Sequence, residues 1–167
     1  MIKKPRHPKG PKANRGLGAL ENCQRSVRLE LHPLASFLHR VNREIGLARD
    51  CVFIRFVSDA EMTRLNRTFR GKNRTTDVLS FPAEASRSPR RLPSQTDRLL
   101  DTFLGDIAIS PRVARRNAES FGRTLASELQ ILILHGVLHL LGYDHETDRG
   151  EMERVENRLR RRLGLVS

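Results

Sequence analysis

The chain of 167 residues is long enough for one domain with a substantial core and some appendage. Its formal net charge is +12, and arginine supplies almost all of the excess; this favours a nucleic-acid partner, because guanidinium groups bind phosphate oxygens bidentately and stack on bases. The two cysteines exclude a disulfide framework and the basic N-terminus has no following apolar run, so we expect a cytoplasmic protein that does not enter a membrane.

The first predicted segment, residues 1–25, is a flexible basic arm. Its lysines and arginines lie among prolines and glycines, and such a composition cannot bury enough apolar surface to fold alone. We expect the arm to contact RNA phosphates without sequence choice. The basic residues are Lys3, Lys4, Arg6, Lys9, Lys12, Arg15 and Arg25.

The pattern becomes that of a folded domain after the arm. Apolar residues alternate over 27–31, which predicts a strand, and a helix follows from Pro33 until Gly46 closes it. The β-branched and aromatic run 51–57 is typical of a central strand. Residues 58–61 then read Ser-Asp-Ala-Glu, a capping box that starts a second helix.

The second half of the chain continues the alternation. Two short strands are predicted at 77–81 and 103–109, separated by residues 83–101, an Arg-, Pro- and Ser-rich stretch that we expect to be a mobile surface loop. Ser110 and Pro111 start a further helix, and Asp148 precedes the last one. The pattern predicts one α/β (α+β) domain with a small mixed sheet of four strands surrounded by about five helices.

Three histidines stand at offsets zero, four and ten: His135, His139 and His145. The first two share one face of a helix, because residues i and i+4 lie one above the other. Gly142 can end that helix in a left-handed turn, so that the chain returns His145 as a third ligand. A single histidine here would be read as packing in an apolar helix, but three at this spacing with an open position predict a catalytic zinc site with one ion per chain.

The spacing equals that of the metzincin zinc peptidases, whose helix has the pattern His-Glu-x-x-His-x-x-Gly-x-x-His. Gly136 stands where those enzymes carry the glutamate that serves as general base. The metal-binding pattern is therefore present, and the base of a peptidase is missing.

Two further blocks, Leu65–Pro82 and Leu104–Ser110, together with the histidine motif, closely resemble the YbeY family of bacterial endoribonucleases. The resemblance runs from about Val27 to Leu165. It implies that residues 26–167 are a metal-dependent endoribonuclease domain that prefers single-stranded RNA, and that the three histidines are zinc ligands. It also implies action in 3′-end maturation of small-subunit (16S) ribosomal RNA and in late ribosome quality control, with small-subunit components as partners. Arg70 corresponds to the conserved cleft arginine of the family.

Zinc chemistry makes the resemblance intelligible. Zinc lowers the pKa of a bound water to about 7, and a guanidinium such as that of Arg70 can stabilise the charge that develops on phosphorus during cleavage. The nucleophile can be either metal-bound hydroxide or the 2′-hydroxyl of the substrate, and the sequence does not distinguish the two. Among nearby carboxylates, Asp144 can orient a ligand histidine, Glu128 is interpreted as a solvated helix residue, and Asp77 is expected to bind loop backbone.

Two other functions compete with the nuclease. One is an RNA-binding ribosome-assembly factor whose metal is mainly structural. The other is a metallopeptidase, which Gly136 disfavours because the leaving amine then lacks an obvious proton donor.

Overall fold

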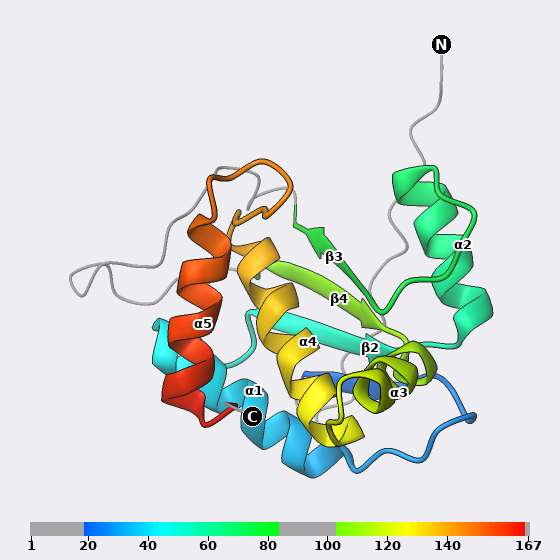
Figure 1. Ribbon diagram of the computed structural model, residues 1–167, viewed down its shortest axis with the longest axis horizontal. Coiled ribbons are helices and arrows are strands. Elements are labelled where there is room, and N and C mark those ends of the chain that lie inside the picture. The colour runs from blue at the N-terminus through cyan, green and yellow to red at the C-terminus, as the bar shows by residue number, and fades with distance from the viewer. Residues whose placement is uncertain (1–18, 84–102, 166–167) are drawn as a thin grey trace.

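The computed structural model describes residues 19–83 and 103–165, and these form a four-stranded mixed sheet with helices on both faces (Figure 1). The strands are β1 (Leu20–Asn22), β2 (Val52–Phe56), β3 (Val78–Pro82) and β4 (Gly105–Ile109). Their order is β1-β2-β4-β3, in which β1, β2 and β4 run parallel and β3 is antiparallel to β4. The predicted fold class is confirmed.

The helices are α1 (Leu31–Ile45), α2 (Asp59–Arg70), α3 (Pro111–Ser120), α4 (Leu125–Leu140) and α5 (Glu151–Leu163). Helix α4 crosses one face of the sheet, and α1, α3 and α5 pack around it (Figure 1). Leu129 to Leu134 are all buried except Gln130, as expected for a helix that is apolar on nearly every side. No helix in the described ranges combines the length and the apolar composition of a membrane span.

Helix α2 covers the opposite face of the sheet. Its Met62 belongs to a small apolar cluster with Leu79 of β3 and Ala108 of β4, which pair directly across the two strands. The neighbouring residues of β4, Ile107 and Ile109, lie in the main core with α4. The alternation of side chains along β4 therefore separates the two layers.

The starts of α2 and α5 and the end of α4 follow the predicted signals, whereas α1 begins at Leu31, two residues before Pro33. Ser58 caps α2 by accepting a hydrogen bond from the Glu61 N–H at 3.2 Å. The carboxylate of Asp148 accepts hydrogen bonds from three successive N–H groups at the start of α5, which satisfies donors that the first turn leaves unpaired. Gly142 has φ +88°, so the histidine helix ends in the left-handed turn expected there.

The first strand was predicted in the wrong place. Residues 27–31 do not form a strand, because the side-chain amide of the buried Gln24 binds both the N–H and the carbonyl of Val27, each at 2.9 Å. The strand is instead Leu20–Asn22, within the segment predicted as an arm, and it pairs with β2. Residues 1–18 of that arm, and residues 84–101 of the predicted loop, lie outside the described residues.

Candidate metal centre and its cleft

The three predicted ligand residues come together at the C-terminal end of α4. The Nε2 atoms of His135 and His139 lie 3.1 Å apart, and the ring of His145 has its centroid 5.5 Å and 5.3 Å from theirs. One ligand nitrogen from each residue lies within 4.8 Å of the other two, so the triad could hold a metal ion. The turn at Gly142 makes this possible, because it redirects the chain after the helix.

The surroundings of His139 favour its neutral imidazole, which is the form that binds metals. Burial lowers the pKa of His139, and the positive charge that His135 and His145 carry when protonated lowers it further. The donor set of three nitrogens in a partly buried pocket fits a metal of the zinc class.

Glu156 of α5 holds one ligand in place. Its Oε2 lies 3.0 Å from Nδ1 of His135, so that Nε2, the other ring nitrogen, faces the triad. Arg160 donates a hydrogen bond to the other carboxylate oxygen. Burial raises the pKa of Glu156, but the contacts with His135 and Arg160 outweigh it and hold the pKa below its ordinary value, so the carboxylate stays charged.

Sequence reasoning missed Glu156. A signal was available, because the acid lies on the same face of the last helix as Met152, Val155 and Leu159 and is itself buried. A carboxylate on an apolar helix face needs a partner, and here the partner is a ligand histidine.

Asp144, the carboxylate expected to orient a histidine, fastens the ligand loop instead. Its Oδ1 accepts a hydrogen bond from the Glu146 N–H at 3.0 Å, and its carbonyl accepts from Thr147 and Asp148 at 3.0 Å and 2.8 Å. These bonds shape the loop that carries His145. Asp77 accepts a hydrogen bond from the Val78 N–H at 2.8 Å, at the first residue of β3 and not in a loop, and it also lines the cleft.

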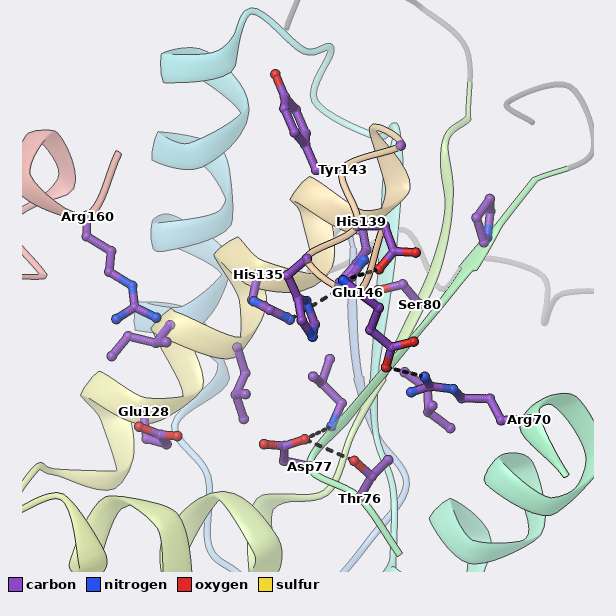
Figure 2. Close-up of a pocket in the computed structure, with 18 of the residues that line it drawn as sticks. Arg70, Thr76, Asp77, Ser80, Glu128, His135, His139, Tyr143, Glu146 and Arg160 are labelled. Carbon is purple, nitrogen blue, oxygen red and sulfur yellow. Dashed lines mark hydrogen bonds and ion pairs between the residues drawn. The ribbon is translucent and has the colours of Figure 1, made fainter. Parts of the chain in front are cut away.

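The triad opens into a cleft of about 780 Å³ (Figure 2). Arg70 lines it from the C-terminal end of α2, where Gly71 at φ +68° ends the helix. Its Nη2 donates to Oε1 of Glu146 at 3.1 Å, and Glu146 directly follows the predicted ligand His145. The predicted cleft arginine therefore lies beside the metal-binding loop, although 76 residues separate it from Glu146.

Glu128 was wrongly interpreted as solvated. It is 4 % exposed, lines the cleft, and pairs with Arg123 through Oε2 and Nη1 at 3.2 Å. The reason is that Glu128 is the first residue of α4 that the fold buries, and a carboxylate is stable in such a place only when it is paired. Among the described residues, three guanidinium groups line the cleft, those of Arg70, Arg123 and Arg160.

Gly136 faces the sheet and not the cleft. A Cβ at this position would lie 2.9 Å from Cδ1 and 3.0 Å from Cγ2 of Ile107 on β4. The Gly136 carbonyl also accepts a hydrogen bond from the Ser80 hydroxyl at 3.1 Å. The position that carries the general base of a metzincin is therefore the contact between helix and sheet in this protein, and a glutamate there has no room.

Comparison with known proteins shows which family this chain resembles. The family described as Endoribonuclease YbeY matches residues 21–164. An Endoribonuclease YbeY from Koribacter versatilis is 46% identical over 134 residues, which cover 80% of this chain and 78% of that protein. Another from Solibacter usitatus is 47% identical over 131 residues, covering 77% and 76% of the two chains.

A solved structure shows the same fold. The solution structure of TM1509 from Thermotoga maritima matches with a TM-score of 0.56 at 28% identity, over 87% of each chain. Together with the match of the family over residues 21–164, these relatives confirm the resemblance found in the three sequence blocks. The chain belongs to the YbeY family of endoribonucleases.

Proposed function

We propose that this protein is a zinc-dependent endoribonuclease that cleaves single-stranded RNA. Its proposed task is 3′-end maturation of 16S ribosomal RNA and late ribosome quality control, in the cytoplasm and in contact with small-subunit components. The observation that carries the cleavage chemistry is the meeting of the histidine triad and Arg70 in one cleft.

His135, His139 and His145 would hold one zinc ion per chain, with Glu156 fixing the ring of the first. When bound, zinc supplies a Lewis acid that makes water acidic enough to act near pH 7. Glu156 also accepts the Nδ1–H of His135, which selects the tautomer whose Nε2 lone pair is available to the metal.

Arg70 would bind the scissile phosphate. A guanidinium offers five N–H donors in a planar fork, and its pair with Glu146 uses one of them. Because Glu146 is exposed, a substrate phosphate can replace its carboxylate at Arg70 with little loss of free energy. Fixed positive charge at the place where negative charge develops lowers the barrier to cleavage.

The proposal is tested by incubating the purified protein with an end-labelled single-stranded RNA and with the same RNA in a duplex. We expect internal cuts in the single strand that a chelator abolishes and that added zinc restores. His139→Ala, purified in parallel, is the control for contaminating ribonuclease. If RNA is bound but never cut, the alternative of an RNA-binding ribosome-assembly factor replaces the nuclease.

The contact between Glu156 and His135 predicts an effect on metal affinity. Glu156→Gln keeps the shape of the side chain but weakens the bond that orients the ligand ring, and we expect about a 10-fold to 100-fold loss of zinc affinity. Competition with a chromogenic chelator measures this. Glu153→Gln, an exposed acid on the same helix, is the matched control. Equal zinc affinities for Glu156→Gln and wild type would limit Glu156 to a packing role.

The basic residues that precede β1 are proposed to add RNA affinity. Deletion should remove residues 2–18 and stop there, because a longer deletion would remove the paired strand Leu20–Asn22. Each lost phosphate contact on a single strand should flatten the slope of log affinity against log salt by about 0.7, so three contacts correspond to about 2. An unchanged slope in a titration with labelled RNA would show that this segment does not engage RNA.

A further inference from the structure

The turn between α3 and α4 presents an exposed aromatic ring. Phe121 is 65 % exposed, a higher fraction than that of Phe69 or Phe103, the other exposed large apolar residues in the described part of the chain. The turn beneath it is well defined, because the Phe121 N–H donates to the Asn117 carbonyl at 3.0 Å and the Arg123 N–H donates to the Ala118 carbonyl at 2.8 Å. The backbone that carries the ring is therefore fixed, while most of the surface of Phe121 faces solvent.

Arg123 supports this ring from the protein side. Its guanidinium carbon lies 5.1 Å from the centroid of the Phe121 ring, within the range of a cation–π contact. The guanidinium is itself fixed by Glu128, whose buried carboxylate lies 3.2 Å away. Arg123 is thus a positioning residue for Phe121. Its own position is set by the buried carboxylate of Glu128.

Both residues line the cleft that contains the histidine triad. Glu128, which anchors Arg123, precedes His135 by seven residues on α4, and this corresponds to about 10 Å along the helix axis. A strand whose phosphate lies at Arg70 and the triad can therefore place a neighbouring nucleotide over the α3–α4 turn.

We infer that Phe121 is a stacking platform for one unpaired base of the RNA substrate, supported by Arg123. This inference rests on the proposed function, because it assumes that RNA occupies the cleft. Unstacked bases of single strands bind by stacking on aromatic side chains and on guanidinium planes, and every base offers such a face. A base inside a duplex is stacked and paired already, so a platform of this kind favours single-stranded RNA.

The test compares Phe121→Ala, Phe121→Leu and Phe121→Trp with the wild-type protein, using the holoenzyme and a short single-stranded RNA. Loss of one stacked base corresponds to about a 5-fold to 100-fold loss of affinity. We expect the alanine and leucine variants to raise KM by that factor while kcat changes little, and the tryptophan variant to keep or improve binding. Phe103→Leu is the matched control, an exposed phenylalanine two residues before β4 that does not line the cleft.

The discrimination between single-stranded and duplex RNA should fall in Phe121→Ala and stay unchanged in Phe103→Leu. If Phe121→Ala cleaves and binds the single strand like the wild type, the platform does not exist and the inference is overturned. If Phe121→Leu keeps full affinity, apolar packing and not stacking is responsible, which also overturns the inference. Failure of the wild-type protein to cut any RNA would instead contradict the proposed function.

Discussion

The double variant His135→Ala, His139→Ala should contain no zinc and should cut no RNA. Wild-type protein purified without a histidine tag should carry close to one zinc ion per chain, because three nitrogen ligands converge within 4.8 Å and the ligand form of His139 is favoured by its lowered pKa. Elemental analysis of both proteins measures the difference.

A second measurement separates loss of metal from loss of fold. A ligand that binds only the folded state at 100 times its Kd stabilises that state by about 2.7 kcal/mol. Added zinc should therefore raise the Tm of the metal-free wild type and leave the Tm of the double variant unchanged. His32→Ala, an exposed histidine on α1, should behave like the wild type. Full zinc occupancy in the folded double variant would contradict the assignment of the ligands.

Arg70→Ala should lower the rate of RNA cleavage much more than it lowers stability. The ion pair with Glu146 is largely exposed, so its loss should cost under about 1 kcal/mol of folding free energy. Loss of one group that stabilises the transition state typically costs about 3 kcal/mol, roughly a hundredfold in kcat. Single-turnover cleavage together with urea unfolding measures both quantities.

Two further variants show which property of Arg70 matters. Arg67→Ala removes an exposed arginine from the same turn of α2 that does not line the cleft, so its cleavage rate should equal that of the wild type. Arg70→Lys keeps the charge but loses the planar fork, and we expect an intermediate rate. Equal rates for Arg70→Ala and Arg67→Ala would show that Arg70 is an ordinary surface residue and does not bind the scissile phosphate.

The amino-acid sequence by itself determined the helices, three of the strands and the proposed ligand set. Each of these depends on residues close together in the chain: the capping box at Ser58, the apolar periodicity of the helices, and the four-residue spacing that places His135 and His139 on one face. The strand predicted at residues 27–31 is the exception, and its cause is a hydrogen bond from a side chain to the backbone. Gln24 uses its side chain to bind the backbone of Val27, and hydrophobic alternation cannot reveal that competition.

Only the tertiary structure decided which charges support the site. Glu156 and His135 are 21 residues apart, and Arg70 and Glu146 are 76 apart, so no local pattern reveals which residue pairs with which. Glu128 resembles a solvated first-turn acid until the packing of α4 buries it against Arg123. That Gly136 faces the sheet and not the cleft also became evident only from the close approach of α4 to Ile107 of β4. The physical reason is common to all four: burial and pairing of a side chain depend on which elements pack together, whereas periodicity and capping depend only on the element itself.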